Sequence, residues 1–133
     1  MYIMDQRQIL SAFNDHFMEF VDDVQLVFPN NDDIATVKTS LVSFRKANPR
    51  LILLAFKDSV IGRYRNEITK GDLNFFIDKD YKQDVDGVGS AKLILEKIDC
   101  LREPIRNMNS DDRVKVIKYM QNLMKLCDLY APN

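Results

Sequence analysis

The chain has 133 residues, which fits one domain and suffices to bury a hydrophobic core without help from disulfide bonds or metals. Hydrophobic residues make up 46% of it and charged residues 29%, a balance that argues against disorder. The net charge of −1 is too small to indicate a nucleic acid or a strongly charged partner by itself. No apolar run approaches the roughly 20 residues that span a bilayer, and the opening MYIMDQRQIL lacks the pattern of a secretory signal. We therefore expect one domain over residues 1–133 that is made in the cytoplasm and is not secreted by a signal peptide.

Two amphipathic helices are predicted in the first third of the chain. The first runs from Asp5 to Phe28 and ends because Pro29 pushes the preceding residue out of helical geometry. The second begins behind a cap at Asn31 or Asp32 and stops at Asn48. Apolar residues recur in both at steps of three and four, which is the helical period. We expect these residues on the buried faces: Leu10, Phe13, Phe17, Phe20, Val21, Val24, Val27 and Phe28, then Ile34, Val37, Leu41 and Phe44.

The stretch from Pro49 to Ile68 predicts a central helix against which the others pack. It opens with the longest unbroken apolar run in the chain, Leu51 to Phe56. Consecutive apolar residues wrap almost completely around a helix, so neighbours must cover this one on more than one side. Gly62 interrupts the helix, which predicts either a close crossing by another helix or a bend, and Gly71 ends it.

The remaining chain predicts a short helical element over Asp72–Asp78, a loop over Asp80–Gly89 and two more helices. The fifth helix starts at Ser90 and kinks or splits near Leu101, because Pro104 removes a backbone hydrogen bond; the last one opens at Asp111 and runs to Tyr130. No alternation of period two lasts five residues, so the predicted class is all-α, a single-domain bundle of about five long helices and one short helix. Their buried residues are expected to be Leu93, Ile94, Ile98, Leu101, Ile105 and Met108, then Val114, Ile117, Met120, Leu123, Met124, Cys127 and Tyr130.

A metal site can be drawn around His16, the one histidine, with Asp15, Glu19 and Asp23 on the same side of the first helix. Di-metal helical bundles need carboxylates from several helices and a Glu-x-x-His arrangement in two of them. This chain has His-x-x-Glu, once. We therefore interpret these residues as a solvated acidic face and predict no metal there.

A calcium loop beginning at Asp78 also fails, because its sixth and twelfth positions are Gln83 and Gly89 instead of Gly and Glu. Nucleophilic catalysis lacks a local Cys–His pair and a glycine-rich phosphate loop. We predict a protein that is not an enzyme, with no catalytic residue, metal or cofactor.

Cys100 and Cys127 lie on the last two predicted helices, on either side of the turn near Asn109. In an antiparallel hairpin they are displaced by roughly 13 Å along the axis, whereas a disulfide needs Cα atoms within about 7 Å. We expect two reduced, mostly buried thiols, as in a reducing compartment.

Basic residues gather on the second and third predicted helices, at Arg45, Lys46, Arg50, Arg63, Arg65 and Lys70. They can grip phosphate, which makes nucleic acid a possible partner, or pair with the acidic faces of the first helix and the 72–86 segment. We favour pairing, so nucleic acid is the less expected partner.

Phe75 and Phe76 lie in the short predicted element between two aspartates. One of them can plug the core, whereas burying both is difficult over so short a piece. An exposed phenylalanine there, with Tyr81 beside it, would anchor a protein partner. Core packing is the favoured interpretation, and the candidate partner-binding residues are Phe75, Phe76, Tyr81, Arg63 and Arg65.

Four stretches resemble a family of short, all-helical proteins encoded by large DNA viruses of algae and protists. They are FNDHFMEFVDDVQLVFP (13–29), NFFIDKDY (74–81), LREPIRNM (101–108) and YMQNLMKL (119–126). Such proteins include minor capsid components, so the resemblance implies a non-enzymatic structural protein of the virion whose partners are capsid proteins. The alternative is a viral intracellular regulator that binds nucleic acid through Arg45, Arg50, Arg63 and Arg65. The sequence leaves the oligomeric state open.

Overall fold

The computed structural model describes residues 5–78 and 90–130, and all regular structure in those ranges is helical. The predicted all-α class is confirmed, and none of the helices described is long and apolar enough to cross a membrane. The predicted loop at 80–89, including Tyr81, lies outside the described residues. In chain order the elements are α1 (Gln6–Val27), α2 (Asp32–Ala47), α3 (Leu51–Ala55), the π-helix η1 (Phe56–Ile61), α4 (Gly62–Lys70), α5 (Asn74–Ile77), α7 (Ser90–Asp99), α8 (Arg102–Arg106) and α9 (Ser110–Leu129).

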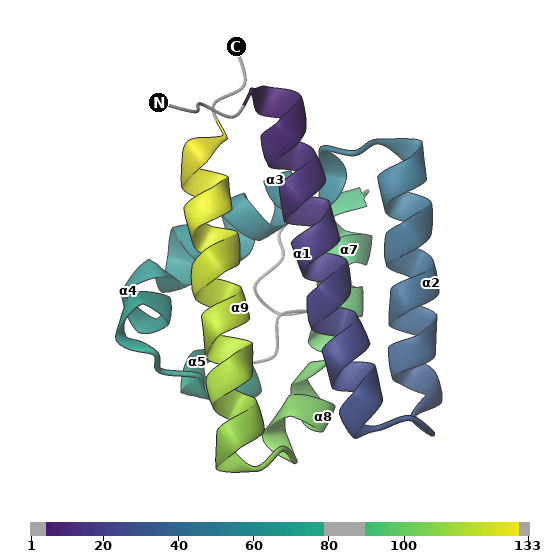
Figure 1. The fold of residues 1–133 in the computed structure, drawn as a ribbon, viewed down its shortest axis with the longest axis vertical. Helices are drawn as coiled ribbons and strands as arrows, with labels where there is room; N and C mark the ends of the chain where they lie inside the picture. Colours follow the sequence, from purple (N-terminus) through teal and green to yellow (C-terminus); the bar gives the residue numbers. More distant parts are fainter. Residues whose placement is uncertain (1–4, 79–89, 131–133) are drawn as a thin grey trace.

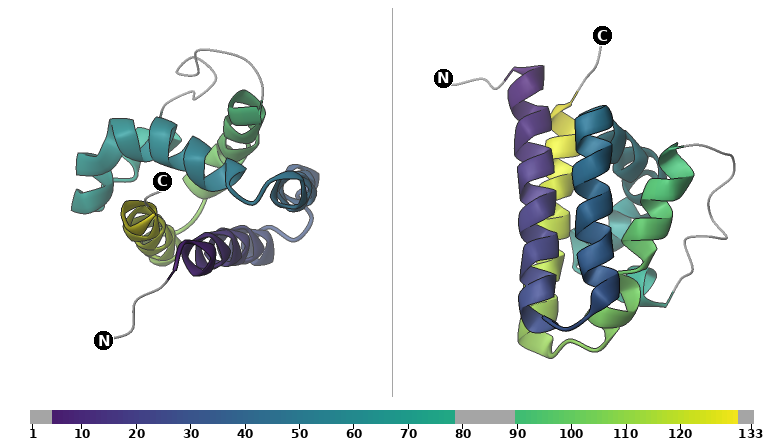
Figure 2. Two further views of the ribbon diagram at one scale, coloured as in Figure 1. Left: turned by 90° about the horizontal axis from the view of Figure 1, so that it is seen from above. Right: turned by 90° about the vertical axis from the view of Figure 1, so that its right-hand side faces the viewer.

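The helices form two packed layers with the core between them. α1 lies beside α9, which runs in the opposite direction, and α2 lies on the other side of α1 (Figure 1). The continuous rod formed by α3, η1 and α4, here called the central rod, crosses behind these helices (Figure 2). α7 packs against α3 and α2, and the short α5 packs against α8. Every element described in full contributes to one contiguous group of buried side chains.

Local sequence signals set most of the helix ends. Asp5 caps α1 in a capping box with Gln8, while Asn31 and Asn109 cap α2 and α9 through their side-chain oxygens. Leu101 lies in the break between α7 and α8, where a split was predicted from Pro104. Each cap satisfies backbone N–H groups that a helix start leaves unpaired, which explains why the predicted boundaries agree with the structure within a few residues.

The central rod is buried, as predicted. Leu53 and Ile68 have no exposed surface, and Phe56 and Ile61 retain 2% and 1%. The rod begins at Leu51 instead of Pro49, because the Asn48 side chain accepts the backbone N–H of Arg50 and folds that segment into a turn. Neighbours cover the rod from several sides, with α1, α2 and α7 contacting α3, and α9 contacting η1 and α4.

The rod bends at its middle, and this bend accounts for Gly62. The backbone N–H of Gly62 donates to the carbonyl of Lys57, five residues earlier, as in a π-helix. Tyr64 follows with non-helical torsion angles (φ −124°, ψ 24°). A Cβ placed on Gly62 would meet only the Lys57 carbonyl, at 3.5 Å, within the residues described. A bend, and not a crossing helix, is therefore the correct alternative of the two.

Several residues expected on buried faces are exposed. Leu93 is 50% exposed, Val114 55% and Val27 40%. On α7 the buried stripe contains Leu95 beside Ile94 and Ile98, and on α9 Val116 takes the place expected for Val114; the full buried stripe of α9 is Val116, Met120, Leu123, Met124 and Cys127. The helical period was correct, but the rotation of each helix about its axis was not, since neighbours decide which side is covered. The expectation that Cys100 is buried is also wrong.

Candidate functional site

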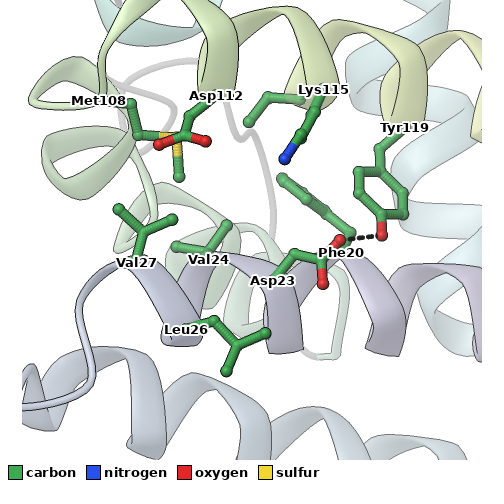
Figure 3. A pocket seen from close by; sticks show the side chains of 10 residues that line it. Phe20, Asp23, Val24, Leu26, Val27, Met108, Asp112, Lys115 and Tyr119 are labelled. Carbon is green, nitrogen blue, oxygen red and sulfur yellow. Dashed lines mark hydrogen bonds between the residues drawn. The ribbon is translucent and has the colours of Figure 1, made fainter.

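A small apolar hollow lies between the C-terminal half of α1 and the N-terminal half of α9, and we call it the α1/α9 cleft (Figure 3). Its volume is about 170 Å³. It forms where two antiparallel helices meet the turn that joins α8 to α9. Drug-sized ligands occupy pockets of roughly 300 to 1,000 Å³, so a hollow of this size suits a single anchoring side chain. Its apolar wall is made by Phe20, Val24, Met108 and Val116.

Leu26 stands at the edge of the α1/α9 cleft and is 77% exposed, the largest fraction among the large hydrophobic side chains described. It lies off the apolar stripe of α1, one residue before the helix ends and close to Asp22 and Asp23 in the sequence. Val27, also exposed, adjoins it. An exposed leucine beside an apolar hollow is the type of surface at which protein partners bind.

The rim of the cleft is polar and links the two helices. The Tyr119 hydroxyl on α9 donates a hydrogen bond to the Asp23 carboxylate on α1 (Figure 3). Burial of Tyr119, reinforced by this hydrogen bond, raises the pKa of its hydroxyl above the ordinary value, so the group stays a neutral donor. The Tyr119 ring also lies 5.5 Å from the Phe20 ring, centroid to centroid. Asp112 and Lys115 complete the charged rim.

Of the acidic residues that could be drawn around His16, Glu19 lies beside it, whereas Asp15 and Asp23 have partners on other helices. The Nδ1 atom of His16 lies 3.6 Å from the Glu19 carboxylate, and the histidine ring packs 4.8 Å from that of Tyr119. Asp15 pairs with Arg45 at 2.8 Å, and Asp23 accepts from Tyr119. Among residues 5–78 and 90–130, no three His, Cys, Asp or Glu side chains are grouped to hold a metal ion.

Phe75 and Phe76 both face the core, with 7% and 1% of their surfaces exposed. Core packing was the favoured interpretation, and the structure buries both rings, although burial of both was expected to be difficult over so short an element. α5 lies under the bend of the central rod, where the Phe75 ring stacks on Tyr64 at 5.0 Å, and it also packs against α8. An element enclosed on two sides can bury consecutive side chains. Neither ring is exposed for a partner.

The basic residues are not gathered into one surface. Arg45 pairs with Asp15 of α1, as predicted, but Arg65 forms a two-pronged pair with Asp128 of α9 at 2.7 and 2.9 Å. The Arg65 hydrogen bond lowers the pKa of Asp128, which keeps the pair charged. α2 and α4 lie on opposite sides of the bundle (Figures 1 and 2), so Arg45 of α2 is far from exposed Arg63 and from Arg65 of α4.

The α1/α9 cleft did not follow from the sequence. It needs two helices that lie about ninety positions apart in the chain. The local signal that could have pointed to it was Leu26, an apolar residue off the buried stripe and beside acidic residues. No protein-family model, curated protein or solved structure matches the chain.

Proposed function

We propose that the protein is a non-catalytic structural protein that works by binding other proteins, with the α1/α9 cleft as its docking surface. Leu26 carries this proposal, because a leucine 77% exposed beside an apolar hollow gains most of its burial only when a partner covers it. The size of the hollow and its mixed, charged rim fit the anatomy of a protein interface, with an apolar centre and a polar edge.

We further propose that the protein is a minor capsid component of a large DNA virus, on the strength of the resemblance of its sequence. Three of the four stretches that resemble that family contribute to the cleft, through Phe20 and Val24, through Met108, and through Tyr119. The partners under this proposal are capsid proteins. Mass spectrometry of purified virions tests it, and absence of this chain from the particles would contradict the virion role.

Lysine-directed cross-linking of those particles tests the docking surface. Lys115 and Lys118 are exposed at the cleft and its continuation along α9, so we expect them to be linked to a second polypeptide. Lys46 on α2 and Lys92 on α7 are exposed on other faces and serve as controls. If a second polypeptide is cross-linked only to the control lysines, the α1/α9 cleft is not the docking surface.

A further inference from the structure

We infer that the occupant of the α1/α9 cleft is Leu26 of a second copy of this chain, in a dimer with two-fold symmetry. The inference rests on the proposed docking function of that surface and names its partner. A two-fold interface uses the same patch on both molecules, so the patch must be complementary to itself. This patch contains both a protruding apolar side chain and an apolar hollow.

Leu26 cannot fill the hollow of its own molecule. Figure 3 shows its side chain on the side of α1 away from Lys115 and Tyr119, whereas Phe20 and Val24 point toward α9. Leu26 nevertheless borders the hollow, so the protrusion and the hollow are neighbours on the surface. When a two-fold axis passes between them, Leu26 of each molecule enters the hollow of the other, and both leucines become buried by the same contact.

The charges around the cleft are also complementary to themselves. Asp23 and Asp112 carry negative charge at the rim, and Lys115 carries positive charge there, with Lys118 beside it. A partner of one strong charge would meet a like charge on part of this surface. A second copy, turned by the two-fold rotation, can set its Lys115 and Lys118 against Asp23 and Asp112.

The hollow continues along the interface between α1 and α9. The α1 helix of a second copy therefore has room to lie against this surface. A second depression of about 230 Å³ shares Asp23, Lys115 and Tyr119 with the cleft and extends it to Lys118 and Asn122. The patch is small, and the core of each molecule is complete without it. Interfaces of this kind give weak dimers that depend on concentration and not obligate ones.

Sedimentation velocity of the full chain tests the inference. At concentrations rising from about 10 to about 500 μM, chosen to bracket a weak dimer, the mass should increase from 15.5 kDa toward twice that value. Leu26→Asp places a charge in the shared hollow and should raise the dissociation constant at least tenfold. Leu93→Asp is the matched control, because Leu93 is a half-exposed leucine on α7, away from the cleft. Circular dichroism establishes that both variants fold.

Two results would overturn the dimer. One is a natural chain whose mass stays at 15.5 kDa throughout this concentration range. The other is an equal dissociation constant for Leu26→Asp and Leu93→Asp. If the chain is monomeric and Lys115 and Lys118 are linked to a different protein in virions, the dimer is wrong while the proposed docking function stands. Reversing the charge with Lys115→Glu should also weaken association, and Lys92→Glu on α7 should not.

Discussion

The two cysteines differ in their surroundings, so they should differ in reactivity. Cys127 is fully buried, and burial raises the pKa of its thiol to about 12, whereas Cys100 is exposed. The thiolate is the reactive form, and Cys127 lacks both access and ionisation. At neutral pH we expect Ellman's reagent to modify one thiol per native chain and two in urea. Cys100→Ser should abolish the native reaction; equal rates for both thiols in the native protein would contradict the burial of Cys127.

The same thiol should make stability depend on alkaline pH. In the unfolded chain it titrates near its ordinary pKa of 9.0, and in the folded protein near 12. Above pH 9 the unfolded chain therefore loses the proton that the native protein still holds, so the free energy of unfolding falls as the pH rises, by at most about 1.4 kcal/mol per unit. Urea titrations at pH 8 and 10 should show a larger loss for the natural chain than for Cys127→Ala. Equal losses would show that folding does not raise the pKa of the Cys127 thiol.

Burial of a side chain was predictable where the local spacing of apolar residues determines it. It was not predictable where a neighbouring helix determines it. Phe13, Phe17 and Phe20 belong to a stripe so continuous that any packing of α1 buries them. The choice of Leu95 over Leu93 depends on how α7 is rotated against α3, which periodicity does not specify. Burial of both Phe75 and Phe76 likewise depends on Tyr64, which lies eleven positions before Phe75 in the chain and stacks on it.

At the scale of elements, a side chain of the π-helix η1 links the central rod to the C-terminal end of α9. Lys57, in η1, donates from Nζ to the carbonyl of Tyr130 at 3.1 Å. The last turn of α9 has no basic residue of its own, so Lys57 supplies the cation that favours a helix C-terminus. The extra residue of a π turn shifts an apolar stripe by about 100°. Such a shift cannot be recognised in the continuous apolar run Leu51–Phe56, where the turn begins. The rod was predicted, and its bend only as one of two alternatives.

Substitution of Leu53 tests how much the central rod contributes to the free energy of unfolding. Leu53 has no exposed surface, so Leu53→Ala removes buried methyl groups and leaves a cavity, at a cost of about 2–5 kcal/mol. Leu93→Ala makes the same chemical change at a half-exposed site and should cost less than about 0.5 kcal/mol. Urea unfolding of the two variants gives both values. Similar losses would mean that the rod is not the centre of the core.

Alanine should change the stability of the protein in opposite directions at Gly62, where α4 begins, and at Gly71, which follows its last residue. Gly62 has helical torsion angles, and its added Cβ meets one carbonyl at an ordinary 3.5 Å, so Gly62→Ala should stabilise the protein by about 0.5–1 kcal/mol. Gly71 ends the helix at φ +75°, where alanine is strained, so Gly71→Ala should destabilise by about 1 kcal/mol. Thermal unfolding measures both changes. Destabilisation by Gly62→Ala would indicate that a neighbour crosses closely there after all.

At the scale of the whole molecule, class and helix order could be predicted, whereas the candidate site could not. Caps, prolines and apolar stripes act over a few residues, and they determined nearly every helix end. The α1/α9 cleft arises from the pairing of the first and last long helices and from the position of Met108 at the turn before α9. No local rule relates these segments, so the exposed Leu26 was a signal without a site until the fold placed Met108 and α9 beside α1.

The contiguous core predicts that the protein unfolds as one cooperative unit. Buried side chains from both layers belong to the same group, so opening one layer exposes the apolar face of the other. The chain has five tyrosines and no tryptophan, so near-ultraviolet circular dichroism follows tyrosine packing while the far ultraviolet follows helix content. In urea the two signals should share one midpoint, in both the natural chain and Leu26→Asp, each measured at low concentration to remove any contribution from association. Tyr119 and Tyr130 report on α9, and Tyr64 on the central rod. A tyrosine transition that precedes the loss of helix would show that side-chain packing is lost before helix content, and it would contradict a single cooperative transition.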